Sequence, residues 1–212
     1  MVQQSLIIGG ADGPTAVFLA NNNRKMSPRD WIRSKIYQIK RKRVSKRIRP
    51  SSHSLKKMVA FMKSTYGIRE VSPQSTTCQE REREMRTSLI LKYQSEDLGI
   101  ILPNPDDLVD TYQELEGYMS RVEECIARAD VVPPEQFPMD FHYYKMKIPD
   151  GELEVEIDFK WNVFSVSSSG GKRAMRKLAR ITRVLYCYYG VCESDIKNKT
   201  ERYNMLLTVL CS

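Results

Sequence analysis

Apolar and polar residues alternate most strictly along residues 152–159, the pattern of a strand with one packed and one wet face. The apolar side holds Leu153, Val155, Ile157 and Phe159, and the polar side holds Glu152, Glu154, Glu156 and Asp158. Residues 141–148 alternate in a similar way, and Pro149-Asp150-Gly151 marks a turn between the two runs. With a further strand at residues 161–166, the pattern predicts a small antiparallel sheet of about three strands across residues 141–166.

Helical spacing of apolar residues dominates the chain before this sheet. The run Ser51-Ser52-His53-Ser54 is expected to be a short hinge or cap that opens a helix, and Gly67 is expected to end this helix. A short extended link at residues 68–71 and a second helix that begins at Ser72-Pro73 follow. A third begins at the Asn-Pro-Asp-Asp cap, residues 104–107. Its apolar row is Leu108, Tyr112, Leu115, Met119, Val122 and Ile126. This row either packs into the domain core or forms a seam with a partner helix.

After the sheet, a Ser-Ser-Ser-Gly-Gly loop at residues 167–171 leads into a helix from Lys172 to Gly190. The buried row expected for this helix is Met175, Leu178, Ile181, Leu185 and Tyr188. One or two further helices fill residues 193–210. The sequence therefore predicts an α+β fold, with several helices packed on the antiparallel sheet and a basic helical arm before it.

Three segments are expected along the chain. They are residues 1–23, residues 24–50 as the basic arm, and residues 51–212 as one α+β domain that is helical over 51–132, a hairpin sheet over 141–166 and helical over 170–211.

Composition places the chain among folded proteins, since 41% of its 212 residues are hydrophobic and 28% are charged. No apolar window is long enough for a membrane span, and the first residues have no basic leader of a secretory signal, so the cytoplasm is the expected compartment. The five cysteines are scattered without CxxC spacing, which argues against a disulfide scaffold and a zinc site. Cys187 and Cys192 are expected to be small buried residues.

The net charge of +8 is unevenly distributed. Residues 24–57 hold 14 of the 34 lysines and arginines and a single acid, Asp30, so that this segment carries +13 and the remainder carries −5. The sequence therefore describes a basic arm attached to a mildly acidic body.

Ser27, Pro28 and Asp30 form a good helix start for this arm, and Ile32, Ile36 and Ile39 follow at helical spacing beside Trp31. The opposite face carries Arg29, Arg33, Lys40, Arg41, Lys42, Arg43, Lys46, Arg47 and Arg49. Such a helix can neutralise nucleic-acid phosphates, lie on an anionic membrane, or dock on an acidic protein surface. It can also pack its isoleucines on the body while its charges face water. No RNP-type motif, zinc finger or helix-turn-helix signature supports the interpretation that this helix binds nucleic acid.

Three other features carry polar chemistry. The acidic row of residues 152–158 can serve as a metal or acid-base site, receive the basic arm, or form the wet side of a strand. The junction SSSGGKR can cradle an anion with Lys172 and Arg173, or act as a flexible turn and helix cap. His53 and His142 stand alone, so a structural or surface role is expected for both. No catalytic residue, metal ligand or cofactor is predicted.

Residues 5–20 read SLIIGGADGPTAVFLA, a glycine-rich loop between two apolar runs. Physically this is a turn, or a loop that can contact a ligand or cation through Asp12. The string is similar to a motif in the membrane-embedded beta subunits of sodium ion-translocating decarboxylases of the oxaloacetate and glutaconyl-CoA type. In that family the loop interrupts a membrane helix and its aspartate is implicated in sodium passage. The resemblance implies a role in ion binding for Gly9, Gly10, Asp12, Gly13, Pro14 and Thr15.

That resemblance covers sixteen of the 212 residues, and it implies a short segment that was inherited or borrowed, not a working pump. The sequence favours a cytoplasmic, non-enzymatic interaction protein whose arm, residues 24–49, binds an acidic partner, either nucleic acid or a protein surface. The alternative is a peripheral membrane accessory at the inner membrane face, or a remnant related to the decarboxylase beta subunit. An enzyme that uses the acidic strand or SSSGGKR is a third hypothesis, for which no substrate is proposed.

Overall fold

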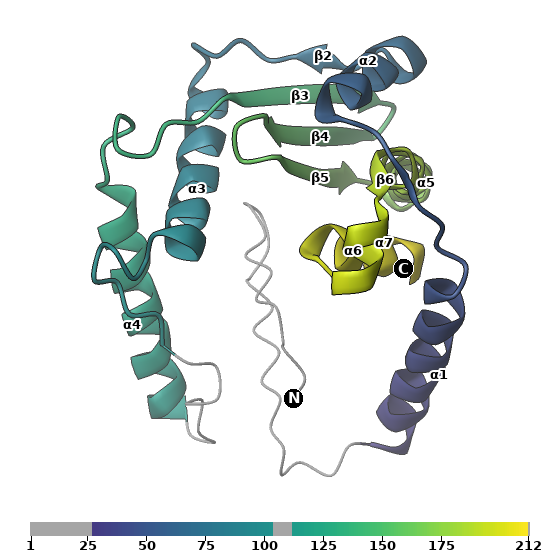
Figure 1. Ribbon diagram of the computed structural model, residues 1–212, viewed down its shortest axis with the longest axis horizontal. Helices are drawn as coiled ribbons and strands as arrows, with labels where there is room; N and C mark the ends of the chain where they lie inside the picture. Colours follow the sequence, from purple (N-terminus) through teal and green to yellow (C-terminus); the bar gives the residue numbers. More distant parts are fainter. Residues whose placement is uncertain (1–26, 104–111, 212) are drawn as a thin grey trace. The chain divides into compact units, whose positions relative to one another are not determined.

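The computed structural model describes residues 27–103 and 112–211 (Figure 1). The predictions for residues 1–23, including the GGADGPT loop, and for the cap at residues 104–107 lie outside these ranges. The described residues form an α+β fold with antiparallel sheets, as the sequence predicted. They belong to two compact units. The sheet unit comprises Lys25–Ser72 and Asp140–Ser212, and the helical unit includes Pro73–Met139.

The sheet unit contains a four-stranded antiparallel sheet in the order β2-β3-β4-β5. Its strands are β2 (Arg69–Glu70), β3 (Phe141–Ile148), β4 (Gly151–Asp158) and β5 (Val163–Gly170). The link predicted at residues 68–71 thus contains an edge strand. The third predicted strand, at residues 161–166, begins later and continues through the expected loop, because β5 pairs with β4 from Val163 opposite Asp158 to Gly170 opposite Gly151.

Asp158 is fully buried, which corrects its predicted place on the wet face. It ends β4 and closes the following turn, since its carboxylate accepts the backbone N–H of Asp140 at 2.8 Å and of Trp161 at 2.6 Å. Two such bonds satisfy a buried carboxylate. Because the strand ends there, the alternation also stops, and Phe159 is only half-buried.

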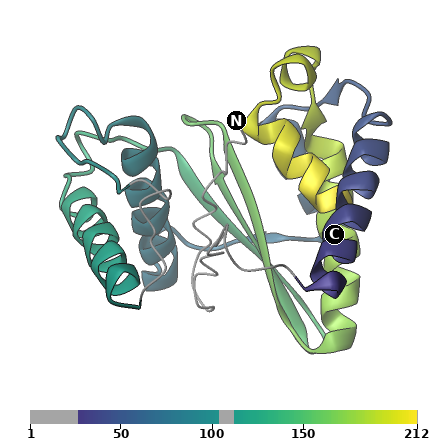
Figure 2. The same cartoon turned by 90° about the horizontal axis from the view of Figure 1, so that it is seen from below.

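Helix α5 (Lys172–Tyr189) and helix α2 (Leu55–Tyr66) share one core with the packed face of the sheet (Figures 1 and 2). Its fully buried side chains include Met58 and Met62 of α2, Leu153, Val155 and Ile157 of β4, and Leu178 and Leu185 of α5. Met175, predicted in the buried row of α5, is exposed, and Ala174 is buried instead. The buried row runs through residues 174, 178, 181 and 185, so that position 175 lies at its edge.

The ends of α2 and α5 confirm the predicted caps. Ser54 accepts the backbone N–H of Lys57, and Gly67 has the left-handed conformation, with φ of 62°. Gly190 ends α5 with φ of 58°, where strand β6 (Gly190–Val191) pairs with β1 (Ser51–Ser52). A Cβ atom at position 190 would lie 1.5 Å from the Ser51 carbonyl oxygen, so only glycine fits there.

Helix α1 (Pro28–Ser45) begins where the sequence predicted and packs against α7 (Glu201–Cys211), which follows the short α6 (Glu193–Asn198). The predicted apolar row does not form this contact, because Ile32, Ile36 and Ile39 are 50%, 60% and 52% exposed. The half-buried Val44 and the buried Ile48, further along the chain, pack against the core instead.

The helical unit contains α3 (Thr76–Tyr93) and α4 (Tyr112–Asp130), which pack side by side (Figure 2). Helix α3 begins after Ser75, which accepts the backbone N–H of Cys78, and not at residues 72–73 as predicted. In α4 the buried residues are Tyr118, Cys125 and Ala129, whereas Ile126 of the predicted row is exposed. The buried face is therefore displaced by one position from the predicted row, of which Leu108 lies outside the described ranges.

Candidate nucleic-acid interface

Helix α5 carries six cations on the side opposite its buried row. They are Lys172, Arg173, Arg176, Lys177, Arg180 and Arg183, and all six are exposed. At 3.6 residues per turn they fall within an arc of about 140° around the helix axis. The apolar side of the same helix is fixed in the core by Leu178 and Leu185. These six residues are called the α5 cationic face.

The α5 cationic face has no acid within its own helix and no ion pair among the described residues. The helix sequence KRAMRKLARITRVLYCYY contains no Asp or Glu, and among the described residues none of the six cations forms an ion pair. Lys172 and Arg173 occupy the first turn, and the last turn has no basic residue. The helix dipole favours the reverse arrangement. The cations therefore do not stabilise the helix, and an external anion can reach them.

The glycine junction before α5 is filled by the chain itself. Gly171 donates its backbone N–H to the Asp150 carbonyl oxygen at 2.8 Å. A Cβ atom at position 171 would lie 1.8 Å from Oδ2 of Asp150, so this carboxylate lies directly over the start of the helix. Lys172 and Arg173 consequently extend the α5 cationic face, and the position of a cradled anion is taken by a carboxylate of the β3–β4 turn.

Two predicted cations of the basic arm form hydrogen bonds to α7. Lys40 Nζ donates to the Cys211 carbonyl oxygen at 2.5 Å, and Arg41 donates to Oδ1 of Asn204 at 3.2 Å. Both bonds hold α1 on α7. The other predicted cations are exposed, namely Arg29, Arg33, Lys42 and Arg43 on α1 and Lys46, Arg47 and Arg49 after it.

The end of the arm lies near the end of α5. Arg49 and Cys187 line the same small cavity of about 160 Å³, together with Ile48 and Gly190. Cys187 is exposed, which corrects its predicted burial, because position 187 follows Arg183 by one turn on the outer side of α5. The structure thus brings Arg49 to the end of the α5 cationic face.

Cys192 is half-buried at the start of α6, with its thiol 3.0 Å from Oδ2 of Asp195. Hydrogen bonds at this helix start explain the sulfur's position. Within the described ranges, no cluster of His, Cys, Asp and Glu is placed to hold a metal ion.

The acidic row of β4 is balanced by lysines of the neighbouring strand. Lys145 Nζ lies 2.8 Å from Glu152 Oε1 and 2.8 Å from Glu154 Oε1, and Lys147 lies 3.9 Å from Glu152. Partial burial acts to lower the pKa of Lys145, but the hydrogen bonds to these two glutamates raise it overall. Apart from the buried Asp158, the row therefore lies on the wet side of the strand, with cross-strand ion pairs at Glu152 and Glu154.

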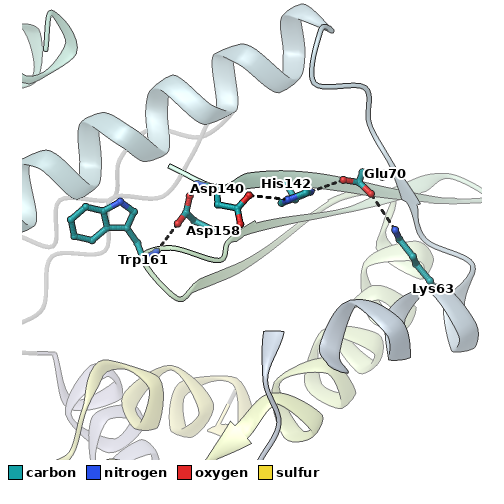
Figure 3. A network of polar contacts seen from close by, with 6 residues as sticks. All are labelled: Lys63, Glu70, Asp140, His142, Asp158 and Trp161. Atoms are coloured by element: carbon teal, nitrogen blue, oxygen red, sulfur yellow. Dashed lines mark hydrogen bonds and ion pairs between the residues drawn. The ribbon is translucent and has the colours of Figure 1, made fainter. Parts of the chain in front are cut away.

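A chain of polar contacts joins β2 to the start of β3 (Figure 3). Glu70 bonds Lys63 at 3.1 Å and Nδ1 of His142 at 2.6 Å, and Nε2 of His142 lies 3.3 Å from Asp140. Burial acts to raise the pKa of Glu70, but hydrogen bonds from His142 and Lys63 lower it overall. These contacts fix the edge strand to its neighbour.

The other histidine also contacts the fold. The ring of His53 stacks on Tyr188 with centroids 4.1 Å apart, and its Nδ1 lies 2.7 Å from the Tyr188 carbonyl oxygen. This contact ties the segment before α2 to the end of α5.

Four residues of the α5 cationic face were not among the predicted site residues: Arg176, Lys177, Arg180 and Arg183. Their signal was present in the sequence, since they recur at spacings of three and four opposite the predicted apolar row.

Comparisons with protein-family models, curated proteins and solved structures gave no match to this chain. The resemblance of residues 5–20 to the decarboxylase motif therefore stays a prediction. Among the residues that the structure describes, no helix is both long and apolar enough to cross a membrane.

Proposed function

We propose that this chain is a non-enzymatic protein that binds nucleic acid through its phosphate backbone. The α5 cationic face is the principal surface, and the basic arm, residues 24–49, is the second. The observation that carries the proposal is a row of six exposed cations on one firmly packed helix, with no carboxylate partner among the described residues.

The spacing of these charges favours a polyanion over an acidic protein surface. From Lys172 to Arg183 the helix rises about 16 Å, at 1.5 Å per residue. Along that length a nucleic-acid duplex carries one negative charge per about 1.7 Å of its axis, a density that a patch of Asp and Glu rarely reaches. Four of the six cations are arginines, whose forked donors suit phosphate oxygens.

The composition of the α5 cationic face also favours contacts to the backbone over contacts to bases. Its exposed arc contains no aromatic side chain on which a base could stack, and no Asn or Gln for a paired contact to a base edge. Phosphate contacts fix position without reading sequence. We therefore expect binding with strong salt dependence and little sequence preference.

The proposed compartment is the cytoplasm. All five cysteines are free in the structure, which fits a reducing environment.

The test is fluorescence anisotropy with labelled 20-mer single strands and duplexes of mixed sequence, at several salt concentrations. The α5 variant neutralises Arg176, Lys177, Arg180 and Arg183 to Gln. The matched control neutralises four exposed lysines outside both basic surfaces, Lys56, Lys147, Lys160 and Lys197. The wild type should bind at low salt, and the α5 variant should lose about three to four units of slope in log K against log salt, at roughly 0.9 per duplex phosphate contact.

The control should lose little of that slope, and the far-ultraviolet circular dichroism of both variants should match the wild type. Equal losses in the two variants would show that only total charge matters, and the assignment to α5 would be wrong. A wild type that binds neither probe at low salt would reject the proposed function.

A second candidate function rests on a separate observation at the start of α1. Trp31 is 55% exposed and the three isoleucines of the row are at least half exposed. Cations flank that row on both sides, Arg29 and Arg33 on one and Lys35 and Lys42 on the other. An apolar strip between cations is typical of a helix that lies in the surface of an anionic bilayer.

In this alternative the chain is a peripheral membrane accessory, and the segment that resembles the decarboxylase beta subunit precedes α1 in the sequence. Vesicles of neutral lipid, with and without anionic lipid, test it in a Trp161→Phe background, where Trp31 is the remaining indole. A blue shift of Trp31 emission that requires anionic lipid and disappears in Ile32→Ser/Ile36→Ser supports the alternative, and unchanged emission removes it.

A further inference from the structure

A second cationic feature lies in a groove between α1 and the corner of α6 and α7. Its volume is about 380 Å³. The residues that line it are Gln38, Arg41, Lys42 and Ser45 from α1, and Lys199, Tyr203, Asn204 and Leu207 from the corner. Three of these eight side chains are cations, and none is an acid. Segments about 160 residues apart in the chain thus build one positively charged groove.

The walls of the groove are held in place by Asn204. Its Oδ1 accepts a hydrogen bond from Arg41 at 3.2 Å, and its Nδ2 donates to the Lys199 carbonyl oxygen at 2.9 Å. Lys199 ends α6 in the left-handed conformation, with φ of 52°, and its ammonium group lies 4.3 Å from the centre of the Tyr203 ring. The amide therefore links the guanidinium of α1 to the backbone that carries Lys199.

We infer that this groove binds a phosphodiester group of a polynucleotide. The bond to Asn204 uses one of the five guanidinium donors of Arg41, and Lys42 and Lys199 have no acid partner among the described residues. A phosphate oxygen accepts such charge-assisted bonds well. The inference rests on the proposed function and adds a second phosphate site to it, between α1 and the corner of α6 and α7.

The shape and surroundings of the groove favour a polymer over free phosphate or a mononucleotide. A pocket for a small ligand typically buries about 70 to 90% of the surface of that ligand. This groove, in contrast, is shallow and open to solvent. Lys46 and Arg47, both exposed, follow directly after α1 in the chain. Cations that continue beyond the groove can contact the neighbouring phosphates of one strand.

The test uses the full chain and a variant that leaves the bond between Arg41 and Asn204 intact. Lys42→Gln/Lys199→Gln is compared with the matched pair Lys56→Gln/Lys160→Gln, in the salt-dependent anisotropy assay with 20-mers. The groove pair should lower the slope of log K against log salt by up to about two units, and the control pair should leave it unchanged. Asn204→Asp, which adds a carboxylate to the groove at nearly the same shape, should weaken binding as well.

A second measurement identifies the ligand. The side-chain amide signals of Asn204 are followed by nuclear magnetic resonance during titration with a 20-mer, with inorganic phosphate and with a mononucleotide. Movement with the 20-mer, and none with millimolar amounts of the small ligands, supports the inference. Saturation by phosphate or mononucleotide that competes with the 20-mer would overturn the choice of a polymer.

The two proposals fail differently. If the wild type binds the 20-mer through α5 but the groove pair matches its control and the Asn204 signals stay fixed, the groove inference is wrong while the function remains. If the wild type binds no 20-mer at all, both are wrong.

Discussion

The sheet unit and the helical unit of this chain have opposite charges. The sheet unit contains 27 Lys and Arg against 11 Asp and Glu, a net charge of +16, whereas Pro73–Met139 contains 6 against 14, a net charge of −8. The +8 of the whole chain is the sum of these two numbers and describes neither unit. A strong field of one sign around one unit guides charged partners to it.

The two units also use their charges differently. In the sheet unit the acids are committed locally: Glu152 and Glu154 pair with Lys145, Glu70 bonds Lys63 and His142, and Asp158 closes a turn. These contacts use few of the lysines and arginines of the sheet unit. The remaining cations include those of α1 and α5. In the helical unit, which has few cations, Arg83 pairs with Asp130 and Arg81 with Glu84. The difference separates charges that hold the fold from charges that are exposed on α1 and α5.

Arg202 is the sheet-unit cation whose removal should have the largest effect on the fold. Its guanidinium donates to the carbonyl oxygens of Tyr189, Gly190 and His53, and lies 3.6 Å from the centre of the Tyr189 ring. Arg202→Met should lower the free energy of unfolding by about 2 to 4 kcal/mol, because three carbonyl groups lose a charged donor. Urea unfolding measures it. Lys197→Met, an exposed control nearby, should change stability little, and equal effects would contradict this role.

Asp130 should have a smaller effect that depends on pH. Hydrogen bonds from Arg83 lower the pKa of Asp130 below its ordinary value of 3.8, with partial burial acting in the opposite direction. A carboxyl group with a lowered pKa stabilises the fold above its unfolded pKa and loses that contribution as the pH falls through the folded pKa. Asp130→Asn should therefore be less stable than wild type at pH 7, by less than Arg202→Met.

The difference between Asp130→Asn and wild type should shrink as the pH falls below about 4, and thermal unfolding at pH 7, 4 and 3 checks this. Glu135→Gln, at an exposed position after α4, is the control. A difference that is independent of pH would show that Asp130 acts through packing and not through its charge.

Much of the sheet unit could be predicted from local patterns. Strict alternation located β3 and β4, and Ser54, Gly67 and Gly190 marked helix ends, because alternation and caps depend on near neighbours. The burial of Asp158 could not be predicted, since Asp140, whose backbone N–H it accepts, lies 18 residues earlier in the chain, at the start of the neighbouring strand. Ser167–Gly170 looked like a loop because serine and glycine favour turns, but pairing with β4 along its full length made it a strand.

The candidate site was only partly predictable for a similar reason. The charge run of residues 24–57 is visible in a simple count, and it led to the basic arm. In the structure, Lys40 and Arg41 of this arm form hydrogen bonds to α7, whose residues lie far away in the sequence. The α5 cationic face needed a helical projection to be seen, and the groove at Asn204 could not be found without the fold.

The smallest expected effect is a gain in stability, whereas the substitutions at Arg202 and Asp130 are expected to lower it. It tests the comparison of the two units most directly. Arg176 and Arg180 are four residues apart on α5, where like charges repel by about 0.2 to 0.5 kcal/mol in exposed helices. If these cations remain for a partner, Arg176→Gln/Arg180→Gln should raise the free energy of unfolding by about 0.5 kcal/mol at low salt. The gain should fade at 1 M salt, where charges are screened within about 3 Å.

Arg176→Lys/Arg180→Lys is the matched control, because it keeps both charges and should show neither the gain nor its salt dependence. Urea unfolding of the three proteins at low and high salt gives the comparison. A loss of stability in the Gln pair, with the Lys pair like wild type, would mean that the charges of α5 hold the fold. A higher free energy of unfolding in the Gln pair, combined with weaker binding to the 20-mers, would mean that these charges destabilise the sheet unit and serve to bind a polyanion.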